Sequence, residues 1–249
     1  MLFAAISTRA DAQSAPNDPA SHPAHQWFEV SAGADSTSTS WSTYSSITAA
    51  LAGDIRENGY RLRLAGGVGR YRYTRSFFDE DRHRHLWPEF FGDRSSFDIL
   101  VGYHWTIGPA TLKAYAGLTE EHYRLSPGPD SPLGADDENV VQGARRGTKL
   151  VLETWTRLGD WGFLQVDANW SEPFKAYGGR VRLGYALNNG WSTGLETGAF
   201  GNIDHDGGRA GGFARYEWQS GEVSLSGGFD GDRERIGSGY ISVAVTARF

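Results

Sequence analysis

The chain has 249 residues and a formal net charge of −6, so it lacks a basic footprint and we expect no nucleic-acid partner. Its 33 glycines and 13% aromatic residues favour strands and turns over long helices. The absence of cysteine excludes disulfides and thiolate metal sites. No apolar run approaches the ~20 residues that a membrane helix needs, but a membrane barrel stays open because its strands alternate.

The first 25 residues divide into two parts that we expect to precede the folded domain. Residues 1–12 begin with an apolar stretch and end in Ala10-Asp11-Ala12, small residues at the spacing that a signal peptidase accepts. They predict the end of a secretory signal that is shorter than usual; a frayed soluble N-terminus is the alternative. Residues 13–25 are mainly Pro, Ser, Asp and Ala with little to bury, which predicts a disordered lead.

Residues 26–249 break into about twelve segments of roughly 9 to 14 residues with period-two alternation, the pattern of strands that cross a bilayer at a tilt. The clearest segment, residues 97–107, has one continuous apolar face. That face consists of Phe97, Ile99, Val101, Tyr103, Trp105 and Ile107. The pattern predicts an all-β fold, a single antiparallel transmembrane β-barrel of outer-membrane type with about 12 strands.

Short and long connections alternate along the chain. Tight turns rich in Gly, Asn and Asp are predicted at 56–59, 108–109, 159–160, 188–190 and 220–221. Longer polar links are predicted at 35–42, 75–95, 124–146, 171–175, 205–209 and 230–235. An outer-membrane barrel has tight turns in the periplasm and loops outside, which puts both termini on the periplasmic side. A soluble sandwich, the alternative, would mix loop lengths at both ends.

Outward-facing aromatic residues sort to two levels on this topology. Beside the short turns lie Tyr60, Trp105, Trp191 and Trp218, and beside the long links lie Phe97, Trp170, Tyr177 and Phe229. Such rings favour the headgroup level of a bilayer, where each ring is half buried and its polar atom stays wet. The sorting therefore predicts two aromatic girdles and contact with outer-membrane lipid.

The inner face carries charges of both signs. The ion-pair candidates are Arg61, Arg63, Asp98, Lys113, Glu153, Arg157, Asp167, Arg180, Arg182, Glu196, Arg215 and Glu217, and the same face carries His104, Glu121, Lys149 and Gln165. These charges either pair across the lumen and close it, or line a narrow hydrated path. Both interpretations stay open, because a bore of this size is one that side chains can nearly fill.

Aromatic residues are also expected in the lumen, namely Tyr115, Trp155, Trp161 and Phe213. They could stack on sugar rings or simply pack the interior. Inward glycines leave space for such rings, and Tyr115 lies opposite Gly102 if residues 108–109 form a two-residue turn.

Enzymatic constellations are weak, so we expect no enzyme, no cofactor and no metal. A Ser-His site is conceivable between Ser96 and His122, but no nucleophile motif supports it. Glu153 and Asp167 could form a carboxylate pair, although the nearby cations favour ion pairing over glycoside hydrolysis. The acidic and histidine-rich stretch 79–85 resembles a metal site, yet its two interspersed arginines oppose cation binding.

Three stretches resemble the BcsS family of cellulose biosynthesis proteins, over roughly residues 27–249. They are YRLRLAGGVGRYRY at 60–73, LVGYHW at 100–105 with LKAYAG at 112–117, and GRAGGFARYE at 208–217 followed by GEVSLSGG at 221–228. The resemblance implies a protein of the Gram-negative outer membrane, expected to be a monomer, that assists cellulose synthesis and secretion. It supplies no catalytic residues.

The long loop around 75–95 is where we expect contact with glucan or with the secretion machinery. Its aromatic candidates are Phe77, Phe78, Trp87, Phe90 and Phe91. We therefore predict an accessory barrel that acts through its extracellular loops. A porin-like channel for glucan or small solutes is the first alternative, and a lipid-modifying enzyme is the second.

Overall fold

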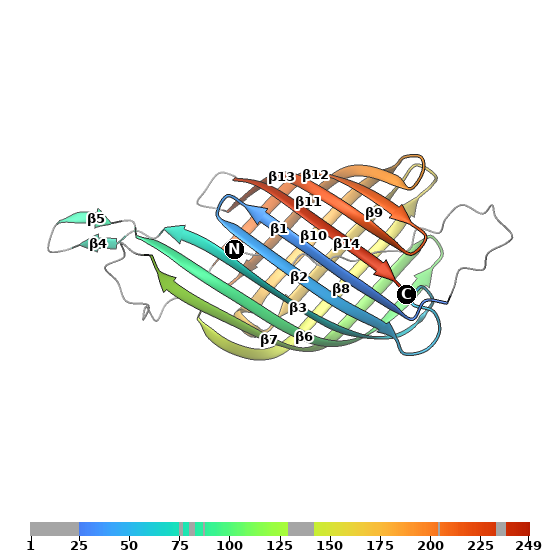
Figure 1. Ribbon diagram of the computed structural model, residues 1–249, viewed down its shortest axis with the longest axis horizontal. Helices are drawn as coiled ribbons and strands as arrows, with labels where there is room; N and C mark the ends of the chain where they lie inside the picture. The colour runs from blue at the N-terminus through green and yellow to red at the C-terminus, as the bar shows by residue number, and fades with distance from the viewer. Residues whose placement is uncertain are drawn as a thin grey trace.

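Twelve antiparallel strands close into one barrel in the computed structural model, which describes residues 25–74, 77–79, 83–86, 88–128, 142–203, 205–232 and 238–249 (Figure 1). The strands are β1 (Phe28–Thr37), β2 (Ser40–Ala50), β3 (Gly59–Thr74), β6 (Glu89–Ile107), β7 (Ala110–Pro127), β8 (Gly143–Leu158), β9 (Gly162–Ser171), β10 (Ala176–Ala186), β11 (Trp191–Asn202), β12 (His205–Trp218), β13 (Gly221–Asp232) and β14 (Ser238–Arg248). Neighbours follow chain order, and β1 pairs with β14. The predicted outer-membrane-type barrel is confirmed. The predicted signal and nearly all of the predicted lead lie outside the described residues.

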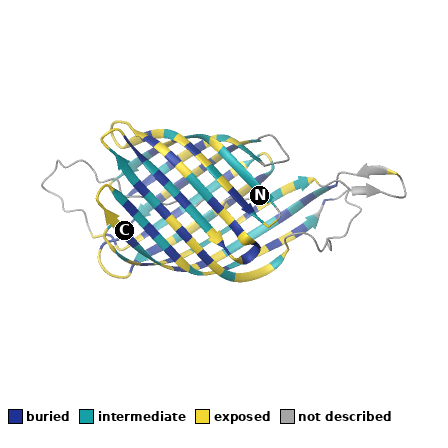
Figure 2. Cartoon of the chain, turned by 180° about the vertical axis from the view of Figure 1, so that it is seen from behind, coloured by how far each residue is buried: buried dark blue, intermediate teal, exposed yellow. Residues whose placement is uncertain are grey.

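Side chains alternate between lumen and exterior along every barrel strand. Buried and exposed residues form a chequered pattern on the wall in Figure 2. Arg63, for example, is 5% exposed, whereas its neighbour Leu64 is 44% exposed. Because successive side chains of a strand point to opposite faces, the apolar set covers the outside while the polar set fills the inside. Among the described residues, no helix is long and apolar enough to cross a membrane.

One end of the barrel, here called the turn end, carries the short connections, the start of β1 and the end of β14. The Phe28 amide donates to the Phe249 carbonyl over 3.1 Å, and residues 108–109 form the predicted two-residue turn. Gly108 and Asn189 adopt positive φ in their turns, a conformation that glycine and asparagine tolerate. The predicted turn at 56–59 is wrong, because the connection from β2 to β3 spans 51–58 and folds inward.

The opposite end, here called the loop end, is less regular than predicted. Strands β1 and β2 are joined by Ser38 and Thr39 alone, and β12 begins at His205, so the predicted links 35–42 and 205–209 are wrong. The polar residues of these segments were taken as signs of loops, but Asp35 and Ser42 are strand residues whose polar side chains face the lumen.

The wall formed by β3, β6, β7 and β8 is the longest part of the barrel. These strands have 16, 19, 18 and 16 residues, whereas β1 and β9 have 10 each. Strand β6 includes 89–95 of the predicted link 75–95, and β7 and β8 include 124–127 and 143–146 of the predicted link 124–146. Beyond the wall, β4 (Phe77–Asp79) pairs with β5 (Arg84–Leu86) (Figure 1). The wall of the barrel therefore extends further at the loop end on this side than on the opposite side.

Aromatic rings gather at both ends of the outer surface. At the turn end, Tyr103 contacts Tyr60 and Trp105 at centroid distances of 5.0 and 4.7 Å. At the loop end, Trp170 and Tyr177 are register partners and both are exposed. Two levels of exposed rings at opposite ends of the wall are the arrangement that membrane barrels use at the two lipid headgroup layers.

Candidate functional site: the lumen and its mouths

A buried ion pair crosses the lumen between strands that are not neighbours. The Arg63 guanidinium on β3 donates twice to the Glu153 carboxylate on β8, and the Nη2–Oε2 distance is 3.2 Å. Strands β6 and β7 lie between them in the sheet. Arg63 also donates to Thr48 Oγ1 over 2.9 Å and stacks over the Tyr115 ring at 3.9 Å. The side chains of both Arg63 and Glu153 are therefore fully engaged inside the barrel.

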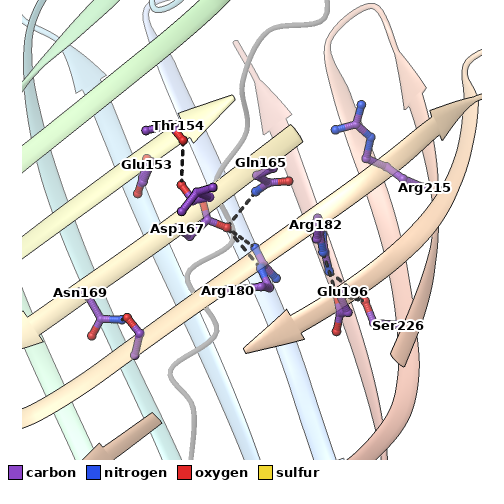
Figure 3. A network of polar contacts seen from close by, with 12 residues as sticks. Glu153, Thr154, Gln165, Asp167, Asn169, Arg180, Arg182, Glu196, Arg215 and Ser226 are labelled. Atoms are coloured by element: carbon purple, nitrogen blue, oxygen red, sulfur yellow. Dashed lines mark hydrogen bonds and ion pairs between the residues drawn. The ribbon is translucent and has the colours of Figure 1, made fainter. Parts of the chain in front are cut away.

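A second network lies on the other side of the lumen, on β10 and its neighbours. Arg182 Nε donates to Glu196 over 2.7 Å, and its Nη2 reaches Ser226 on β13 over 2.8 Å (Figure 3). Tyr240 on β14 donates to the same carboxylate over 2.7 Å. This network ties four strands together, because its members come from β10, β11, β13 and β14.

A third charged group lies between the two networks along the wall. Asp167 on β9 accepts hydrogen bonds from Gln165 over 2.9 Å and from Arg180 over 2.8 Å (Figure 3). Asp167 and Glu153 are register partners on adjacent strands, as the sequence suggested. Each carboxylate has an arginine partner, so the pair has no free acid for glycoside chemistry.

The loop-end half of the lumen contains further buried ion pairs. Arg209 on β12 pairs with Asp35 on β1 over 2.7 Å and with Asp230 over 2.9 Å. Lys149 pairs with Asp98 over 2.6 Å. On β7, Glu121 is bound by Arg94 over 3.2 Å and by Ser171 over 2.6 Å. The sequence assigned Asp98, Glu121 and Lys149 to the inner face but did not predict which residues pair with which.

An aromatic cluster lies in the turn-end half of the lumen. Trp155, Phe163 and Phe213 pack in a row with centroid distances of 5.9 and 6.1 Å, and Arg215 lies 4.4 Å over the Phe163 ring. Trp161 is not part of it, because it lies in the turn between β8 and β9 and is 50% exposed. Strand parity does not continue through a turn, so the prediction for Trp161 was wrong.

A residue that the sequence did not single out is buried at the loop-end mouth. Phe174, in the 3₁₀ turn η1 (Pro173–Lys175), is 2% exposed and adopts a φ of 54°. Its ring packs against Tyr123 at 4.8 Å, and Arg145 stacks over it at 4.7 Å. The sequence signal was present, since Pro173 and Phe174 are apolar residues inside an otherwise polar link.

The remaining candidates lie in several environments. Lys113 is buried, Arg157 and Glu217 are half-buried, and Arg215 approaches Glu222 and Glu217 at 3.6 and 3.3 Å. Arg61 and His104 contact backbone carbonyls at the turn end.

The predicted loop aromatics are divided between strands and undescribed side chains. Phe90 and Phe91 belong to strand β6 rather than to a loop, and the buried Phe90 ring packs on Tyr73 at 5.5 Å. Phe77 and Phe78 lie in β4, while their side chains and Trp87 fall outside the described residues.

The Ser-His site that the sequence left conceivable does not assemble in the structure. Ser96 is the register partner of the inward-facing Glu121, whereas His122 pairs with Ser95 on the outer face, so the two conceivable partners lie on opposite sides of the wall. Among the described residues, no group of three or more His, Cys, Asp or Glu side chains could hold a metal ion.

Comparisons with known proteins agree with this picture of a barrel. The KdgM porin is similar at 9% identity with a TM-score of 0.50, and the match covers 89% of this chain and 99% of that one. The KdgM porin in complex with disordered oligogalacturonate is similar at 10% identity with a TM-score of 0.50 and the same coverage. The COG4313 outer membrane channel from Pseudomonas putida F1 is similar at 12% identity with a TM-score of 0.49, and the match covers 94% of this chain and 100% of that one. The similarity to the two KdgM structures supports the fold alone.

The sequence itself was also compared with curated proteins and with family models. No curated protein matches the sequence. The model of the family described as cellulose biosynthesis protein BcsS matches residues 30–249. The chain therefore belongs to the BcsS family of cellulose biosynthesis proteins.

Proposed function

We propose that this protein is an accessory barrel of bacterial cellulose synthesis and secretion, placed in the outer membrane of a Gram-negative cell, with a closed lumen and no catalytic activity. The observation that carries the proposal is the set of buried ion pairs that join non-neighbouring strands inside the lumen, above all Arg63 with Glu153 and Arg209 with Asp35. Each pair joins strands separated by two others. Opening the bore would separate buried charges, which is costly.

The chemistry of the lumen also argues against passage of a neutral glucan. Such a chain would need an open bore lined by rings and neutral hydrogen-bonding groups. Here the central level is filled by arginine and carboxylate side chains that satisfy one another, and the aromatic cluster of Trp155, Phe163 and Phe213 is buried rather than presented to a bore.

The loop end is the surface we assign to contact with glucan or with the secretion machinery. The long wall of β3, β6, β7 and β8 projects there and leads into the two-stranded sheet β4–β5 (Figure 1). A barrel that acts through this end needs no open lumen and can work as a monomer. A porin-like passage is the second candidate, favoured by the fold similarity to the KdgM porin. The lipid-modifying alternative has no comparable support, since Ser96 and His122 lie on opposite faces.

Planar-bilayer conductance combined with cellulose output tests the proposal. The purified wild-type barrel should be electrically silent, while deletion of the protein lowers cellulose export. Replacing residues 77–87 with a short Gly-Ser linker should reproduce that loss, whereas Arg70→Ala on the outer face should export normally. A large stable conductance of the wild type that Arg182→Ala or Glu153→Ala alters would establish the channel instead.

A further inference from the structure

The connection between β2 and β3 is unlike the other turns at its end of the barrel. It spans residues 51–58, and its middle folds inward. Asp54 and Ile55 are 7% and 4% exposed, whereas Leu51 at its start is 58% exposed. In an ordinary surface turn, an aspartate and the isoleucine next to it would be exposed to solvent. The middle of this segment is therefore part of the barrel interior.

Arg61, on the inner face of β3, holds the segment through its backbone. Its Nη2 donates to the carbonyls of Asp54 and Ile55 over 3.1 and 3.0 Å, and also to the Glu57 carbonyl. Its Nη1 donates to the Tyr60 carbonyl over 3.0 Å. The residue is 1% exposed. The guanidinium carries five N–H donors, so this one side chain binds four backbone carbonyls.

The segment is tied to two further strands. Just before β1, the Gln26 amide donates to Asp54 Oδ2 over 2.9 Å, and the Ile55 amide donates to the Gln26 carbonyl over 2.7 Å. From β6, His104 Nδ1 lies 3.3 Å from the Ile55 carbonyl. The segment thus contacts the ends of β1, β3 and β6 as well as the strand it follows.

We propose that residues 51–58 are a plug that closes the turn-end mouth of the barrel on the side of β1, β2, β3 and β6, with Arg61 as its latch. On the side of β8, β9 and β12, the buried rings of Trp155, Phe163 and Phe213 pack together inside the barrel. The lumen is then sealed from the periplasm unless the plug withdraws. This inference goes beyond the proposed function, because it concerns access to the lumen and holds whether or not the loop end binds glucan.

Site-directed thiol labelling tests the plug, and the absence of native cysteine makes a single reporter unambiguous. The reporter is Ser31→Cys, a near-isosteric change at a buried, inward position of β1 near the turn end. A charged methanethiosulfonate reagent should label it slowly in the otherwise wild-type barrel. Arg61→Met should raise the labelling rate at least about tenfold, the effect expected for loss of one hydrogen bond from a charged donor.

Two controls separate withdrawal of the plug from general loosening. Glu57→Ala keeps the backbone carbonyl that Arg61 binds and should leave labelling unchanged. A second reporter, Ser42→Cys in the loop-end half of β2, should not respond to Arg61→Met. A heat-modifiability gel verifies that each variant is folded, and Asp54→Asn provides a second way to loosen the plug if Arg61→Met does not fold. Fast labelling of the wild-type reporter, or unchanged labelling in folded Arg61→Met and Asp54→Asn, overturns the proposal.

Discussion

Removing the Glu153 carboxylate should destabilise the barrel strongly, because it leaves Arg63 charged and unpaired inside the lumen. Both side chains of this pair are almost fully buried, with exposed fractions of 6% and 3%. Breaking a buried ion pair by deleting one partner costs about 3–5 kcal/mol. We therefore expect Glu153→Ala to lower the free energy of unfolding by about that amount.

The chain offers a matched control on its outer surface. Arg70 and Asp93 form a similar two-bond pair between β3 and β6, but their side chains are 55% and 40% exposed. Exposed pairs of this kind contribute about 0–1 kcal/mol. Asp93→Ala should therefore have little effect, although the charges and the number of hydrogen bonds are the same.

Urea titration of the barrel in lipid bilayers, followed by the fluorescence of its 9 tryptophans, measures both effects. A double variant, Arg63→Met with Glu153→Leu, should recover most of the lost stability, because apolar side chains of similar volume often replace a buried pair at little cost. If Glu153→Ala costs no more than Asp93→Ala, then the centre of the lumen is hydrated and the argument for a closed barrel fails.

Three further outcomes follow from the same structure. Gly102→Val should destabilise by about 1–3 kcal/mol, since the Tyr115 ring lies where its side chain would go, and a lowered unfolding temperature on semi-native gels would check it. Phe174→Ala should cost about 3–5 kcal/mol in urea titrations through loss of the loop-end cap. Burial opposes ionisation of Asp54, but hydrogen bonds from the Arg56 side chain and from the Gln26 and Arg56 amides outweigh it and lower the pKa of this carboxyl to about 2. The stability difference between wild type and Asp54→Asn should therefore be constant above pH ~4 and disappear as the pH falls through about 2; a difference lost already near pH 5 would contradict this assignment.

Strand parity was sufficient to assign Arg63 and Glu153 to the inner face, because a two-residue period leaves only two faces to choose between. It could not pair them. The height of a residue in the barrel depends on the register of every intervening strand, and β3 and β8 are joined through two others. Contacts across a lumen are therefore invisible to a pattern that runs along one strand.

The errors came from taking polar segments as loops and from taking connections as surface segments. Asp35 and Ser42 are polar because they face the lumen, and the prediction assigned their segment to a loop. The opposite error hid Phe174 and Ile55, which are apolar residues in connections that fold inward. Parity fails at these positions since it has no meaning where the backbone leaves the sheet, so buried residues in connections need a separate search.

The pairing of β1 with β14 constrains how this protein can be assembled. Glu29 and Arg248 are register partners and hydrogen bond with each other although they are 219 residues apart in the chain. Until the last strand arrives, both edges of the sheet present unpaired amides and carbonyls, and each such group is costly in hydrocarbon. Strands therefore cannot enter the bilayer one at a time as they are exported. The sheet has to be nearly complete, with its edges protected, before it is committed to the membrane.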